Sequence, residues 1–168
     1  MPCCDDEEGS SVEPARGSQF KMLETRIFNS AGESVIAEIH EIQARVFEHP
    51  FALGKIRERV SGNDAFLSIH AYSDGGIVGF KTGFSIGSGV FYSWIGGVDP
   101  EHRRLGLGKR LMLIQHQALK ALGFVKVRTK TQNRFRDMII LNLKSGFEIV
   151  DTFVEEGKGL QILLEKQL

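Results

Sequence analysis

Cysteine is scarce in this chain. Its 168 residues include two cysteines, Cys3 and Cys4, which are adjacent in a polar stretch. Two adjacent cysteines make a poor disulfide framework, and no histidine or further cysteine stands at the spacing of a zinc ligand, so we expect no metal site. A chain of this length buries about 70% of its unfolded surface on folding, so it needs neither kind of cross-link to hold a core.

Long apolar runs are also missing. No segment approaches the roughly 18 consecutive apolar residues of a membrane span. The first residues are acidic instead of basic and then apolar, as a secretory leader would be. These absences argue against a membrane partner and favour a protein of the cytoplasm.

Net charge is absent overall but unevenly distributed, since 21 Lys and Arg balance 21 Asp and Glu. Acidic residues gather in a Gly-, Ser- and Pro-containing start, so we expect residues 1–19 to form a disordered tail and residues 20–168 to form one domain. Residues 102–136 hold ten Lys or Arg and no Asp or Glu. Such a stretch is typical of a solvated face or of a site for an anion, either a polyphosphate or nucleic acid.

Hydrophobic periodicity predicts a mixed α/β domain. Turn signals at 74–76 and 87–89 indicate an antiparallel meander, and the strand–helix–strand unit over 90–131 predicts two parallel strands side by side. We expect strands at 22–28, 65–72, 77–85, 90–98, 124–131, 147–154 and 160–166, and helices at 35–46, 51–60, 107–122 and 134–144.

The turn from Arg103 to Gly108 leads from a predicted strand into the helix that begins at Leu107. The first turn of a helix carries backbone N–H groups without partners and a partial positive charge, which together bind phosphate. Gly106 and Gly108 have no side chain to block that approach. The turn lacks the third glycine of a dinucleotide site and the Gly-Lys-Ser/Thr ending of a nucleoside-triphosphate loop.

Two segments resemble the GNAT superfamily of N-acetyltransferases. The stretch GGVDPEHRRLGLGKRLM is similar to the central motif of that superfamily, and NRFRDMIILNLKSGF is similar to its next motif. The likeness is strongest over 90–147, and the order of elements fits from about residue 22 to the end. It implies a mixed, mostly antiparallel central sheet flanked by helices, with a splayed pair of parallel strands that admits acetyl-CoA.

The resemblance also implies which residues bind acetyl-CoA. Backbone amides of 104–109 would hold the pyrophosphate, the backbone of Gly97 and Val98 the pantetheine arm, and Asn133 would contact that arm. Gly96-Gly97 is the expected site of a strand bulge. The candidate binding residues are Gly97, Val98, Arg103, Arg104, Leu105, Gly106, Leu107, Gly108, Lys109 and Asn133.

The catalytic positions depart from the resembled family. Asn142 stands where a proton-donating tyrosine is common; an amide can hydrogen-bond a sulfur but cannot act as an acid. Tyr92 stands where a basic glutamate is common. Tyr92 and Asn142 are therefore the candidate catalytic residues, with Glu148 as a further candidate base. His40, His49, His70 and His116 show no partner pattern, so we interpret each as structural.

The resemblance predicts acetyl transfer from acetyl-CoA to a primary amine of a small molecule or peptide, by direct attack in a ternary complex. A non-catalytic CoA-binding sensor or scaffold is the alternative that the two departures leave open. A nucleic-acid-binding module fits less well, because the chain is neutral overall and carries no recognition motif. The acceptor stays open among polyamines, peptide N-termini, lysine and aminoglycosides, and the resemblance allows a homodimer through the final strands.

Overall fold

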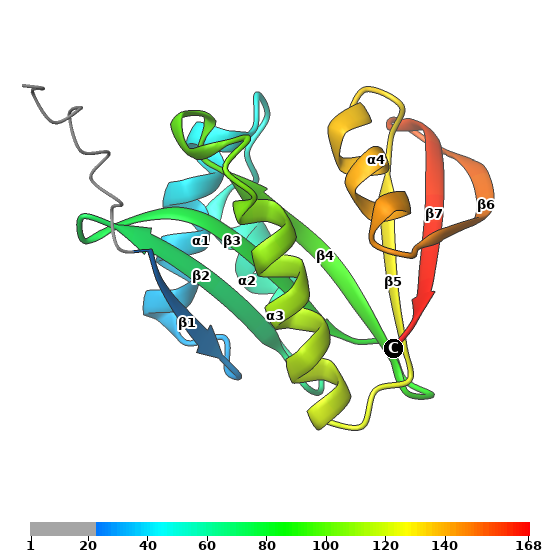
Figure 1. Ribbon diagram of the computed structural model, residues 1–168, viewed down its shortest axis with the longest axis horizontal. Helices are drawn as coiled ribbons and strands as arrows, with labels where there is room; N and C mark the ends of the chain where they lie inside the picture. The colour runs from blue at the N-terminus through cyan, green and yellow to red at the C-terminus, as the bar shows by residue number, and fades with distance from the viewer. Residues whose placement is uncertain (1–22) are drawn as a thin grey trace, which may run out of the picture.

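The computed structural model describes residues 23–168, in which a twisted sheet is covered by helices on both faces (Figure 1). The predicted tail and both cysteines lie outside the described residues. The strands are β1 Glu24–Phe28, β2 Leu67–Ser73, β3 Gly76–Ser85, β4 Val90–Val98, β5 Lys126–Thr131, β6 Glu148–Glu155 and β7 Gly159–Gln167. The helices are α1 Glu33–Val46, α2 Leu53–Val60, α3 Leu107–Ala121 and α4 Arg136–Lys144, with a 3-10 turn at Pro100–His102.

The seven strands have the order β1-β2-β3-β4-β5-β7-β6. All neighbours are antiparallel except β4 and β5, which are parallel. The predicted meander and the predicted parallel pair are both confirmed, as is the mixed α/β fold class. The turn between β2 and β3 places Asp74 and Gly75 at positive φ, which a tight hairpin requires and these residue types tolerate.

Two apolar cores hold the layers together. On one face of the sheet, Leu111, Met112 and Leu119 of α3 pack against strand residues such as Phe91 and Val127. On the other face, α1 and α2 pack their isoleucines against β2 and β3. Each core side chain in these clusters is less than a tenth exposed, so burial fixes both helix layers to the sheet.

Strands β4 and β5 pair for only three residues before they separate (Figure 1). Val90–Tyr92 pair with Lys126–Arg128. Beyond them the Thr129 hydroxyl donates to the Ser93 carbonyl at 2.9 Å. We call the separating segments, Ser93–Val98 and Thr129–Thr131, the β4–β5 splay. It leaves one side of the β4 backbone without a partner strand.

The bulge in β4 lies at Trp94, so the expectation of a bulge at Gly96-Gly97 is wrong. Ser93 pairs with Gly83 and Ile95 with Thr82, which makes Trp94 the extra residue. Gly83 permits this, because a Cβ there would lie 2.2 Å from the Tyr92 carbonyl oxygen. Gly97 pairs regularly, and a Cβ on it would lie 2.3 Å from Val46 Cγ1 of α1. Its missing side chain therefore makes room for a helix.

Candidate active site

The turn before α3 presents an uncapped helix start. Gly106 is the N-cap residue at φ 77° and ψ 3°, and no side chain caps the helix. The first helical bond runs from the Arg110 N–H to the Gly106 carbonyl, so the amides of Leu107, Gly108 and Lys109 precede the helical ladder. A Cβ on Gly106 would meet nothing within 4 Å. The space in front of these amides is open to a phosphate.

The side chains of this turn divide into three roles. Arg104 and Lys109 are exposed, and neither forms an ion pair with a residue of the described range 23–168. Arg103 instead braces the backbone, since its Nε donates to the Val98 carbonyl at 3.0 Å. Leu105 is exposed and Leu107 is buried in the core, so Leu107 can offer a ligand its amide only. Unpaired cations beside free amides suit a pyrophosphate.

The exposed backbone edge of β4 begins at the splay. Asp99 N–H donates to the Val78 carbonyl on β3. Backbone groups alternate along a strand, so those of Gly97 also point to β3, whereas those of Gly96 and Val98 point into the splay. Of the two predicted pantetheine contacts, the register therefore directs Val98 to the splay, and sequence reasoning missed Gly96.

Helix α4 borders the phosphate turn from the other side of the splay. Leu141 Cδ2 lies 3.4 Å from where a Gly108 Cβ would stand, so α4 packs against the start of α3. Asn142, one residue on, is 2% exposed, and its Oδ1 has no hydrogen-bond partner among residues 23–168. A buried unpaired oxygen costs about 1–3 kcal/mol, and this one is closed to solvent, so a ligand does not reach it in this arrangement. Asn133 is exposed in the segment between β5 and α4.

Tyr92 lies on the opposite face of the sheet from α3. Its ring packs edge-on against Phe84 at 5.8 Å between centroids. Burial raises the pKa of the phenol, Glu155 raises it further, and Arg59 and Lys158 oppose the rise. At neutral pH the group is therefore protonated and serves as a hydrogen-bond donor or acid instead of a base.

Glu155, which acts on the pKa of Tyr92, is not suited to take a proton at neutral pH. Hydrogen bonds from Lys130, at 2.5 Å, and from Lys158 hold the pKa of Glu155 at about 2. Glu148, the further candidate base, is exposed on β6, the outer strand of the sheet.

Lys81 of β3 is a titratable residue that sequence reasoning missed. Its side chain extends on the α3 face across Gly96, because a Cβ on Gly96 would lie 3.3 Å from Lys81 Cγ. Burial lowers the pKa of the ammonium to about 8. Lys81 thus places an amine with a pKa of about 8 on the strand next to Gly96 of β4.

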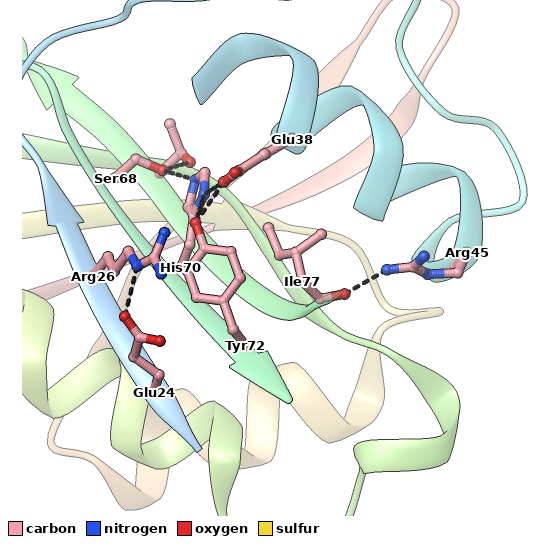
Figure 2. A network of polar contacts seen from close by, with 9 residues as sticks. Glu24, Arg26, Glu38, Arg45, Ser68, His70, Tyr72 and Ile77 are labelled. Carbon is pink, nitrogen blue, oxygen red and sulfur yellow. Dashed lines mark hydrogen bonds and ion pairs between the residues drawn. The ribbon is translucent and has the colours of Figure 1, made fainter. Parts of the chain in front are cut away.

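A buried polar network joins α1 to the sheet (Figure 2). Glu38 Oε2 accepts from His70 Nδ1 at 2.7 Å and from the Tyr72 hydroxyl at 2.6 Å. Ser68 Oγ lies 2.8 Å from His70 Nε2 and 2.6 Å from Thr82 Oγ1. Burial lowers the pKa of His70, so the ring is neutral. Although the order is carboxylate, imidazole, hydroxyl, no substrate can reach it, because Ser68, His70 and Thr82 are 0% exposed.

This network positions the end of α1 beside β4. Arg45 lies on α1 between Glu38 and the C-terminal end of the helix, and it donates to the Ile77 carbonyl (Figure 2). Its Nε also forms an ion pair with Asp99 Oδ2 at 3.0 Å. Val46 then lies against Gly97. The sequence shows no partner pattern for His70, because Glu38 lies 32 residues away and only the packing of α1 on β2 brings the two together.

His116 is among the buried residues of α3. It is 5% exposed, its ring lies 5.6 Å from that of Phe147, and its Nδ1 lies 3.4 Å from Lys166 Nζ. Burial, with Lys166, Lys81 and Lys120 nearby, lowers the pKa of His116 to about 3. Its role is structural, as expected.

Metal-ligating clusters and membrane-spanning helices are both absent from the described residues 23–168. No group of three potential metal-ligating side chains occurs among these residues. No helix among them is both long and apolar enough to cross a membrane.

Comparison of the sequence with protein families identifies the class of protein to which this fold and site belong. The family described as the acetyltransferase (GNAT) domain matches residues 65–149, half of the chain. The chain therefore belongs to the GNAT acetyltransferase family. No curated protein sequence matches the chain.

Solved structures share the fold at low identity. The ribosomal-protein-S18-alanine N-acetyltransferase from Escherichia coli is 15% identical, with a TM-score of 0.73 over 86% of this chain and 94% of the other. The NatC complex bound to Gag peptide and CoA is 13% identical, with a TM-score of 0.71 over 87% and 98%. A Bacillus anthracis protein in complex with acetyl coenzyme A, provisionally assigned as a streptothricin acetyltransferase, is 21% identical, with a TM-score of 0.58 over 67% of each chain.

Proposed function

We propose that this acetyltransferase moves an acetyl group from acetyl-CoA to a primary amine within a ternary complex. The observation that carries the proposal is the β4–β5 splay beside the uncapped start of α3. The splay offers unpaired strand backbone to an extended arm, and the helix start offers free amides to a pyrophosphate. An acetyltransferase family and a structural neighbour that contains acetyl coenzyme A support the same donor.

The binding roles follow from the geometry of the turn and the strand. The amides of 104–109 hold the pyrophosphate, with Arg104 and Lys109 supplying charge. The backbone of Gly96 and Val98 binds the pantetheine arm, and a strand N–H such as that of Val98 stabilises the charge that develops on the thioester oxygen.

The reaction forms an N–C bond and breaks the C–S bond, so one proton must leave the amine and the sulfur must accept one. We assign the proton acceptor to Lys81, because a catalytic base works best when its pKa lies near the working pH. Tyr92 lies on the face of the sheet opposite to Lys81, is protonated and can donate a hydrogen bond there. The thiolate, with a free pKa of about 8.5, can also take its proton from water.

A thiol-release assay with acetyl-CoA and a panel of primary amines tests the proposal, with calorimetry of CoA binding beside it. Release of thiol that depends on one of the amines supports acetyl transfer. CoA binding without turnover on any amine would favour a sensor or scaffold. Salt-sensitive DNA or RNA binding without CoA affinity would overturn the proposal.

A further inference from the structure

Arg59 of α2 has an unusual electrostatic position. Within residues 23–168 it is the one exposed cation outside 103–144 that forms no ion pair. Its neighbours on the same helix are both paired: Arg57 with Glu33, at 2.6 Å, and Lys55 with Glu58, at 2.9 Å. Arg59 is therefore the one cation of α2 without an ion pair, and its side chain instead interacts with Tyr92 and Phe84.

Three elements converge where Arg59 lies. Its guanidinium carbon stands 5.6 Å from the ring centroid of Phe84 on β3. Phe84 contacts Tyr92, the last β4 residue that pairs with β5. Arg59 and Lys158, from the β6–β7 turn, both act on the pKa of Tyr92. Arg59 thus stands at the closed end of the β4–β5 splay, on the face away from α3.

The surface around Arg59 has aromatic side chains on one side and polar side chains that can donate hydrogen bonds on the other. Trp94 packs 5.5 Å from Phe51 and 6.3 Å from Phe84, ring centroid to ring centroid. A hollow of about 280 Å³ adjoins Phe84 and Arg59, and its lining also includes Ser61 and Asn63. The two charged residues that complete this lining, Lys55 and Glu58, neutralise each other.

The charge of the surroundings is positive. Glu155 is held by both Lys130 and Lys158, so these three groups together carry one positive charge, to which Arg59 adds a second. A simple polycation would be repelled from this surface. An anionic group would find an unpaired guanidinium, whose planar donors match the two oxygens of a carboxylate.

We propose that the acetyl acceptor is an amine that also carries a carboxylate, and that Arg59 binds this carboxylate while the aromatic side chains of Phe51, Phe84 and Trp94 contact its apolar part. The inference rests on the proposed acetyl transfer. The carboxylate can belong to a peptide, as an acidic residue close to a free N-terminus, or to a small amino acid.

The test compares matched acceptors that differ in one carboxylate. One pair is the peptide Ala-Glu-Ala-Ala amide and its Gln counterpart; the other is 4-(aminomethyl)benzoate and 4-(aminomethyl)benzamide. In at least one pair, we expect KM to be about tenfold lower for the acceptor with the carboxylate than for its amide counterpart. A tenfold difference corresponds to the free energy of about one charge-assisted hydrogen bond. The pair that shows the preference distinguishes a peptide acceptor from a small one.

The variants assign the preference to a residue. Arg59→Gln should bring the two KM values of a pair together while CoA affinity is unchanged, and Arg57→Gln, on the same helix, should keep the preference. Equal KM values within both pairs for the unaltered protein, or a preference that survives Arg59→Gln, would overturn the proposal. If the protein binds CoA but acetylates neither pair, the proposed function fails for these acceptors. In that case, calorimetry measures how tightly each acceptor of a pair binds to the protein–CoA complex. Tighter binding of the carboxylate that is lost in Arg59→Gln would support the role of Arg59. Equal binding within both pairs, or a preference that survives Arg59→Gln, would overturn it.

Discussion

Replacing Gly106 by valine tests the phosphate site directly. A Cβ at this position would enter open space at the start of α3, where we propose that the pyrophosphate binds, so a branched side chain there should hinder its approach. Loss of two amide–phosphate hydrogen bonds at about 1.5 kcal/mol each amounts to about 3 kcal/mol. We therefore expect CoA affinity to fall about a hundredfold, as measured by calorimetry.

The control for Gly106→Val must reproduce its backbone strain. Gly106 has φ 77°, where valine costs about 1–2 kcal/mol of stability whether or not CoA binds there. Gly123, just beyond the other end of α3, has φ 84° and also has nothing within 4 Å of its virtual Cβ. Gly123→Val should lose similar stability and keep its CoA affinity. Unchanged CoA affinity in a folded Gly106→Val protein would refute the placement of the pyrophosphate.

Three further predictions concern single side chains. Asn142→Leu removes the unpaired buried oxygen, so the protein should be unfolded by urea no more easily than before; a large loss of stability would contradict this account. Lys81→Met should lower kcat about a hundredfold and remove an inflection near pH 8 from the kcat profile, where activity rises as Lys81 loses its proton; an unchanged profile would exclude Lys81 as the base. His116 binds a proton in the unfolded chain below about pH 6.5, but in the folded protein only near pH 3. Stability should therefore fall as pH decreases from 6.5, by about 2 kcal/mol at pH 5, and His116→Gln should reduce that slope in urea titrations at pH 7 and 5; an identical slope would contradict the assignment.

The order of strands and helices was predictable because it depends on neighbours in the chain. The apolar stripe through Leu107 and Leu111 repeats at helical spacing, and Asp74-Gly75 marks a hairpin by its tolerance of positive φ. The ends of the elements differ from the predicted ranges by no more than two residues.

The candidate site was predictable only in part. The phosphate turn is local, so two glycines and the helix that follows them were enough to predict it. The bulge at Trp94 was not predictable, because it depends on Gly83 across the sheet. Lys81 and Arg59 gave no signal of their own, since an isolated lysine or arginine is ordinary until its surroundings are known.

The sequence by itself therefore determined the elements, their order and the anion-binding start of α3, because hydrogen bonds within a helix turn or a hairpin join residues close in the chain. Tertiary structure alone decided which β4 backbone groups face the splay, because strand register sets that direction. It also decided that the buried His70 pairs with Glu38 and that Arg59, which has no ion pair, lies beside Tyr92. In such pairs the two residues lie far apart in the chain, so only the packing of helices on the sheet brings them together.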